Sequence, residues 1–139
     1  MWSIDVYDKG NFERFYLKLD DLDQAVLQAA IDHVLKFYGI DICRNEWGKN
    51  LGGGLYEFRV RRSLGAILGE FGPPGAVDEL SPRERARRPL LRVFCTFHGE
   101  RIVLLLGGYN KRTDPSPKRQ NKEIRKARKF LDIWKGDIA

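Results

Sequence analysis

Apolar and polar residues alternate with a period of two in short stretches of the chain, which is the pattern of half-buried strands. The first stretch is WSIDVY, in which Trp2, Ile4 and Val6 share one side. Two further apolar stretches, LLRVFCTF at 90–97 and RIVLLLGGY at 101–109, are separated only by the turn sequence HGE. This order predicts a β-hairpin.

The stretch LYEFRVRR, residues 55–62, predicts a strand with two different sides. Tyr56, Phe58 and Val60 point one way and suit a core. The opposite side is polar and mostly cationic, with Glu57, Arg59 and Arg61. Because strand side chains alternate between the two faces of a sheet, we expect the cations to lie on the face away from that core.

A helical spacing of apolar residues predicts two antiparallel helices after the first strand. The first carries Phe12, Phe15, Tyr16 and Leu19, and the second carries Leu22, Val26, Ala29, Ala30, Val34 and Phe37. Asp20 or Asp21 can cap the second helix at its start, and Gly39 can end it. The following RNEWGKNLGGG, residues 44–54, is interpreted as a polar, glycine-rich connection.

A last helix is predicted to begin with Ser116 as its cap and Pro117 as its first residue. Its apolar stripe is Ile124, Ala127, Leu131 and Trp134, and its other faces hold Lys122, Arg125, Lys126, Arg128 and Lys129. This charge is either a solvated helix face or an RNA contact, and charge patterning alone does not separate the two.

These elements predict an α+β fold in one domain spanning residues 1–139. The N-terminal strand and the helical hairpin pack on a small antiparallel sheet, and the basic C-terminal helix closes the fold. We expect helices to cover one face of the sheet and to leave the other face for a ligand.

Charge is divided unevenly along the chain. Residues 1–50 carry 6 basic and 9 acidic side chains, and residues 51–139 carry 19 and 10, so the two parts have net charges of −3 and +9. A basic surface in the second part suits nucleic acid or another polyanion. No signal sequence or bilayer-length apolar run is present, so we expect a cytoplasmic protein with no membrane partner.

No composite enzyme motif occurs, and we expect no cofactor and no metal. Cys43 and Cys95 lack metal-site spacing and are interpreted as small core residues. His33 is interpreted as structural, whereas His98, in the predicted hairpin turn, is either structural or an acid or base.

Cations recur on adjacent predicted strands and form the candidate site. The candidate catalytic residues are Arg59, Arg61, Arg92, Lys111 and Arg112, and the candidate RNA-binding residues are Tyr109, Lys118, Arg119, Lys122 and Arg125. Guanidinium and ammonium groups can stabilise the dianion that forms when a 2′-OH of RNA attacks its own phosphate. Lysine can also transfer protons if neighbouring cations lower its pKa, while each arginine taken singly can instead pair with Glu57, Glu84 or Glu100.

The sequences GGGLYEFRVRR, LLRVFCTFHGERIVLLLGGYNKR and DPSPKRQNKEIRKARKF, in this order, resemble the phage-derived, HigB-like branch of the RelE/HigB toxin superfamily. The resemblance implies a RelE-like α+β fold and the toxin of a type II toxin–antitoxin system. Such a toxin is a metal-independent endoribonuclease, an mRNA interferase that cuts translated mRNA on the ribosome and inhibits translation. It also implies a cognate helix-turn-helix antitoxin. The family's basic strand and loop positions correspond to Arg59, Arg61, Arg92, Lys111 and Arg112.

Two features depart from the family pattern. Glu57 stands where some relatives have a basic residue, which shifts the expected chemistry onto the arginines and Lys111. The second is residues 63–89, an insertion where relatives have a tight turn of ~2–5 residues. It is either a disordered or lineage-specific loop or an extra contact to ribosomal RNA through Arg83, Arg85, Arg87 and Arg88, and SLGAIL within it either extends the strand or begins a short helix.

Two rival functions remain open. The first is a non-catalytic binding protein of the RelE/ParE superfamily, such as a topoisomerase inhibitor, which Glu57 favours. The second is an RNA- or ribosome-binding module that acts through charge alone and binds RNA without cleaving it.

Overall fold

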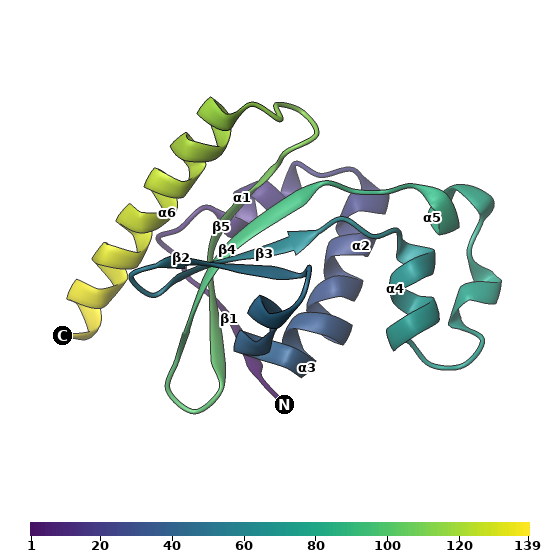
Figure 1. Ribbon diagram of the computed structural model, residues 1–139, viewed down its shortest axis with the longest axis horizontal. Helices are drawn as coiled ribbons and strands as arrows, with labels where there is room; N and C mark the ends of the chain where they lie inside the picture. Colours follow the sequence, from purple (N-terminus) through teal and green to yellow (C-terminus); the bar gives the residue numbers. More distant parts are fainter.

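A five-stranded mixed sheet lies at the centre of the computed structural model, which describes residues 1–139 (Figure 1). Its strand order is β1-β5-β4-β3-β2. The strands are β1 (Ser3–Val6), β2 (Gly48–Gly52), β3 (Leu55–Val60), β4 (Leu91–His98) and β5 (Ile102–Asn110). Only β1 and β5 are parallel, and every other neighbouring pair is antiparallel. The expected α+β fold is confirmed, but the sheet is mixed rather than antiparallel, because β1 belongs to it as a strand parallel to β5.

The first sheet face is covered by the N-terminal helices. They are α1 (Phe12–Leu17) and a continuous helical segment made of α2 (Asp21–Ala30), the π-helical turn η1 (Ile31–Leu35) and α3 (Lys36–Tyr38). Asp20 caps α2, because its Oδ1 accepts the Asp23 backbone N–H at 2.8 Å. The chain then turns at Gly39, where φ is 53° and a Cβ would overlap the Trp2 ring. Only glycine fits this turn without strain.

The main core lies between these helices and the sheet. Phe58, Val60, Val93, Cys95 and Val103 are fully buried on this sheet face. Leu27, Val34 and Leu35 are fully buried on the helix side of the same core. The alternation read from residues 55–62 is therefore confirmed, and Cys95 is the small core residue that was expected.

The last helix, α6 (Pro117–Ile138), lies on the opposite sheet face. Ser116 caps it as predicted, since its Oγ accepts the Arg119 backbone N–H at 3.1 Å. Ala127 and Leu131 are buried in a second core with Leu55 and Leu106. The expectation that helices cover only one sheet face is thus wrong, because the apolar stripe of α6 requires a surface of its own to pack on.

Three details of the sequence interpretation are also wrong. The glycine-rich connection follows the 3₁₀ helix η2 (Gly39–Arg44) and contains the edge strand β2, whose short polar sequence carries no alternating pattern. Val6 and Phe37 were assigned to apolar faces but are 47% and 65% exposed. Both lie at or near the end of an element, where the apolar spacing continues although the core no longer covers the side chains.

The insertion at residues 63–89 is folded. It forms α4 (Leu64–Phe71), the 3₁₀ helix η3 (Ala76–Glu79) and α5 (Pro82–Ala86). Ile67 is fully buried in the main core, and Arg87 contacts Asp20 and Asp23 at 2.7 and 3.1 Å. The disordered-loop alternative is therefore wrong, and SLGAIL begins a helix. None of the helices combines the length and hydrophobicity needed to cross a bilayer.

We expect Ile67→Ala to lower the free energy of unfolding of the whole protein by about 2–5 kcal/mol, because Ile67 fills the core shared with the sheet. Denaturant unfolding measures this effect, and Glu79→Ala, at an exposed position of the same insertion, is the control. Equal stability of the two variants would mean that the insertion is only loosely attached.

Candidate functional site

Three polar side chains form a row across the second sheet face, beyond the part that α6 covers. Arg59 in β3 lies opposite Arg92 in β4, and Arg92 lies opposite Tyr109 in β5. Residues directly opposite in adjacent strands have Cβ atoms about 4.5–5.5 Å apart. The sheet register therefore brings together candidates that lie far apart in sequence.

A buried carboxylate lies beside this row. Glu57 is fully buried, and its Oε1 accepts a hydrogen bond from Nε of Arg59 at 2.7 Å. The same oxygen lies 3.7 Å from Nε of Arg92, whose side chain is 5% exposed. Two like charges opposite each other destabilise a sheet. Glu57 offsets that repulsion and is the counterion of both arginines.

Several polar atoms of this cluster are buried without a hydrogen-bond partner: Glu57 Oε2, Arg92 Nε and Tyr109 Oη. Buried polar groups are nearly always paired, so each exception calls for an explanation. These atoms belong to adjoining residues on one sheet face, so several unpaired donors and acceptors lie close together. The unpaired Arg92 Nε and Tyr109 Oη can donate to an acceptor, whereas Glu57 Oε2 requires a donor.

Lys111 follows β5 directly and is half-buried. Its backbone N–H donates to the Leu90 carbonyl oxygen at 2.9 Å, which ties the loop to the start of β4. Burial lowers the pKa of the Lys111 ammonium, and the positive charge of Arg92 lowers it further, while Glu57 opposes the shift. A lysine with a lowered pKa can exchange protons nearer neutral pH than a solvated one.

Arg61 lies at the edge of this cluster, since its charge lowers the pKa of both Arg92 and Lys111, whereas Arg112 lies outside it. Arg61 is exposed, and its Nη2 lies 3.8 Å from a carboxylate oxygen of Glu46. Arg112 is exposed beyond the end of β5, where its charge acts on Asp23 at the start of α2. Burial raises the pKa of Asp23, and Arg87 and Arg112 oppose that shift. The compact part of the site is therefore Arg59, Arg92 and Lys111 around Glu57.

Tyr109 is buried and lies next to Arg92 on the same sheet face. Its ring stacks on Phe94 with a centroid distance of 6.1 Å, and the guanidinium of Arg119 lies 5.4 Å from its centroid. Because Arg119 lies over the ring, Tyr109 presents no free face to a base in this structure. Its hydroxyl is the group that remains unpaired.

The cations of α6 divide into structural and free groups. Arg128 donates to the carbonyl oxygens of Leu51 and Gly52 at 2.6 and 3.1 Å, and Lys135 donates to Gly53 at 3.0 Å. These contacts fasten the β2–β3 turn to α6. The remaining candidates, Lys118, Lys122 and Arg125, are exposed and have no ion-pair partner.

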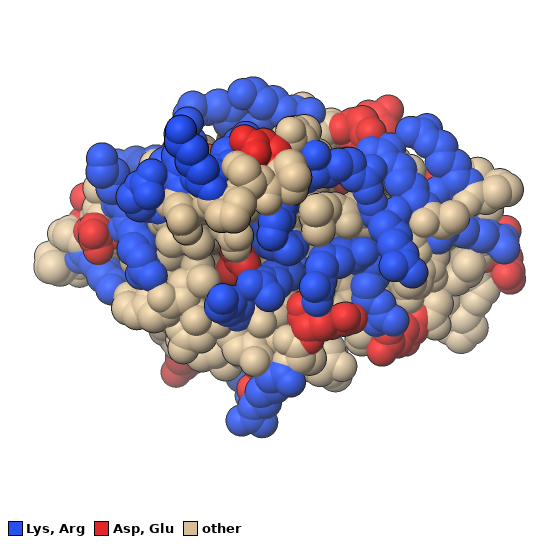
Figure 2. Space-filling model, turned by 45° about the horizontal axis from the view of Figure 1, so that its top comes forward, with Lys and Arg blue, Asp and Glu red and all other residues tan.

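The cations of the insertion divide in the same way. Arg87 pairs with α2, and Arg85 donates to the carbonyl oxygens of Leu80 and Asp78 at 3.1 and 3.2 Å. Arg83 and Arg88 are exposed without a partner. Figure 2 shows a broad band of Lys and Arg side chains across this face, from the α6 side to the insertion side.

The histidines and cysteines lie outside this cluster. His98 packs on Trp134 with a centroid distance of 4.7 Å, at the far end of β4 from Arg92. This packing favours the structural alternative, and His98 Nε2 is buried without a hydrogen-bond partner. Both cysteines are free, and burial raises the pKa of the Cys95 thiol.

We expect Arg92→Gln to raise the pKa of Lys111, because the substitution removes the cation that acts most strongly on that ammonium and leaves Glu57 to act on it. Arg92→Lys keeps the charge and should leave the pKa low. NMR titration of the Lys111 side-chain carbon resonances measures both variants. An unchanged pKa in Arg92→Gln would show that burial alone sets the value.

We expect Glu57→Gln to reduce the free energy of unfolding by about 3–5 kcal/mol, because the buried guanidinium of Arg92 then has no anionic partner. Glu46→Gln is the control, since Glu46 pairs with Arg61 and Arg62 at the surface and such pairs contribute at most about 1 kcal/mol. Chemical denaturation compares the two variants, and a Glu57→Gln protein as stable as the Glu46→Gln protein would contradict the counterion role.

Comparison of the chain with protein-family models gives no match, and comparisons with curated proteins and with solved structures give no match either. The resemblance to RelE/HigB toxins therefore stays a hypothesis that rests on sequence motifs alone.

Proposed function

We propose that this protein is the toxin of a type II toxin–antitoxin system, a ribosome-dependent endoribonuclease that cleaves translated mRNA. The observation that carries the proposal is the cluster of Arg59, Arg92 and Lys111 around the buried carboxylate of Glu57. It combines two arginines, Arg92 nearly fully buried and Arg59 24% exposed, with a lysine of lowered pKa, and both kinds of group are useful for phosphodiester cleavage.

Each step of the reaction has a candidate group. The 2′-OH of a ribose loses its proton and attacks the adjacent phosphorus, a bond from O2′ to phosphorus forms, and the bond to the 5′ oxygen of the next nucleotide breaks. Arg59 and Arg92 stabilise the dianionic phosphorane. Neutral Lys111 takes the 2′-OH proton, and the ammonium formed in this way then gives a proton to the leaving 5′ oxygen.

The outer cations would hold the RNA rather than act on the scissile phosphate. Arg61 lies at the edge of the cluster, Arg112 lies outside it, and Lys118, Lys122 and Arg125 are exposed along α6. The basic band in Figure 2 supports contact with a long polyanion such as mRNA in the ribosome. A helix-turn-helix antitoxin would be the partner that neutralises the toxin in the cytoplasm.

A second candidate function is a non-catalytic binding protein of the RelE/ParE superfamily, such as a topoisomerase inhibitor or an RNA- or ribosome-binding module. The specific observation in its favour is the ion pairing of Glu57, which compensates the charges of Arg59 and Arg92. A site whose arginines are paired internally has less charge left for a phosphate.

Expression of the protein in growing bacteria should arrest translation and leave new RNA 5′ ends inside translated codons, which primer extension maps. Lys111→Ala should reduce the cleavage at least about tenfold, because acid–base catalysis by that side chain is removed, and Lys111→Ala with Arg92→Ala should relieve the arrest. Lys129→Ala is the control because Lys129 is an exposed α6 cation with no assigned role.

Circular dichroism of each variant shows whether it remains folded. A folded double variant that still arrests growth and leaves the same RNA ends would contradict the assigned site. Arrest with a DNA-damage response and intact transcripts would favour the topoisomerase inhibitor instead.

A further inference from the structure

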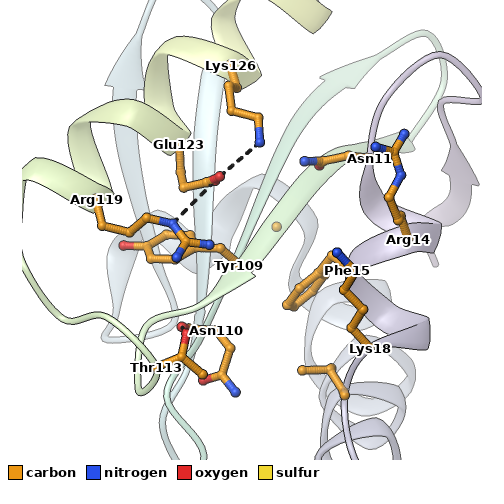
Figure 3. Close-up of a pocket in the computed structure, with 12 residues that line it drawn as sticks. Asn11, Arg14, Phe15, Lys18, Tyr109, Asn110, Thr113, Arg119, Glu123 and Lys126 are labelled. Atoms are coloured by element: carbon orange, nitrogen blue, oxygen red, sulfur yellow. Dashed lines mark hydrogen bonds and ion pairs between the residues drawn. The ribbon is translucent and has the colours of Figure 1, made fainter.

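A cavity of about 290 Å³ lies beside the Arg59–Arg92–Tyr109 row, between α1, the end of β5 and the start of α6 (Figure 3). We call it the α1–α6 pocket. Its lining includes Asn11, Arg14 and Lys18 from the α1 side, and Arg119 and Lys126 from α6. Its volume is at the lower end of the range found for small-molecule sites.

The charge of the α1–α6 pocket is strongly positive. Four cations line it, Arg14, Lys18, Arg119 and Lys126, against a single carboxylate, Glu123. Glu123 lies 3.2 Å from Lys126 and 3.9 Å from Arg119, while Arg14 and Lys18 have no ion-pair partner. Figure 3 shows α1 and α6 presenting these residues from opposite sides. Such an excess of cations favours an anionic ligand.

Two glycines shape one wall of this region. A Cβ at Gly107 would overlap Asn11 Oδ1, and a Cβ at Gly108 would lie 2.6 Å from the Phe15 ring. The missing side chains let Asn11 and Phe15 lie directly on β5. Asn11 Oδ1 is buried and has no hydrogen-bond partner. The Asn11 side chain can accept a hydrogen bond through Oδ1 and donate through Nδ2, so it suits the donors and acceptors of a base or ribose.

We propose that the α1–α6 pocket binds one nucleotide of the RNA strand that the Arg59–Arg92–Lys111 cluster cleaves. The inference rests on the proposed function, because that RNA is its ligand. The cations of α1 and α6 hold the nucleotide's phosphate, and Asn11 contacts its base or ribose. Tyr109 links the two sites, since it lines the pocket and lies opposite Arg92 in the sheet.

The Lys111→Ala protein is suited to the test, because it should cleave the RNA at least about tenfold more slowly. Binding of a fluorescent five-nucleotide single-stranded RNA is measured by anisotropy over a range of salt concentrations. Arg14→Gln with Lys18→Gln should reduce the slope of log K against log salt by about 0.7 for each phosphate that the variant no longer neutralises. Both residues are exposed, so the fold should be retained.

The matched control is Arg101→Gln with Lys129→Gln, which removes the same charge from two exposed positions outside the pocket. Its slope should stay unchanged. Equal reductions of the slope in the two double variants would overturn the inference, because the general positive field would then explain the binding.

NMR identifies the ligand class. A nucleoside 3′-monophosphate should shift the backbone amides of Gly107 and Gly108 and the side-chain amide of Asn11, and inorganic phosphate should bind there at least about tenfold more weakly, because it lacks the base and ribose that Asn11 contacts. Equal affinity for inorganic phosphate, or shifts confined to the Lys111 cluster, would overturn the nucleotide site.

The two proposals can fail separately. If the unmodified protein leaves mRNA intact in cells, the ribonuclease proposal fails, while the pocket variants still report on RNA binding. If the unmodified protein cleaves mRNA, and the Arg14→Gln, Lys18→Gln variant binds the five-nucleotide RNA like the control, the pocket inference alone is overturned.

Discussion

The buried carboxylate of Glu57 is the interaction on which the polar sheet face depends. Without it, Arg59 and Arg92 would lie opposite each other in adjacent strands with no anion between them. Desolvation lowers the pKa of Arg92, although a guanidinium remains charged at neutral pH. The carboxylate therefore lets the sheet keep two fixed cations at a place where burial would otherwise disfavour them, and these cations in turn act on Lys111.

Packing of α6 decides how much of this face remains open. Its apolar stripe covers Leu55, Phe94 and Leu106, while Arg128 and Lys135 fasten it to the β2–β3 turn. The first turns of the helix extend past this contact toward the end of β5. The later turns of α6 thus cover one part of the sheet face, and its first turn borders the polar cluster. Packing of this one helix therefore affects both the stability of the fold and the shape of the cluster.

The sequence predicted those parts of the fold that local patterns determine. Alternation gave the two sides of residues 55–62, and capping residues gave the start of α6 at Ser116. It could not give the position of β2, whose short polar sequence is held by pairing with β3. Nor could it separate Arg112 from Lys111, because adjacent residues past a strand end diverge according to the loop's path.

Glu57 shows why single positions were harder to interpret than elements. In the sequence, Glu57 interrupts a run of cationic positions, because the sequence shows its negative charge and not its partners. In the fold its burial and its 2.7 Å hydrogen bond to Arg59 make it a part of that pattern. A buried ion pair is weak evidence for stability, because desolvation offsets much of the attraction. A cluster that retains this cost, and leaves Glu57 Oε2 and Arg92 Nε unpaired, gains little net stability from its own contacts.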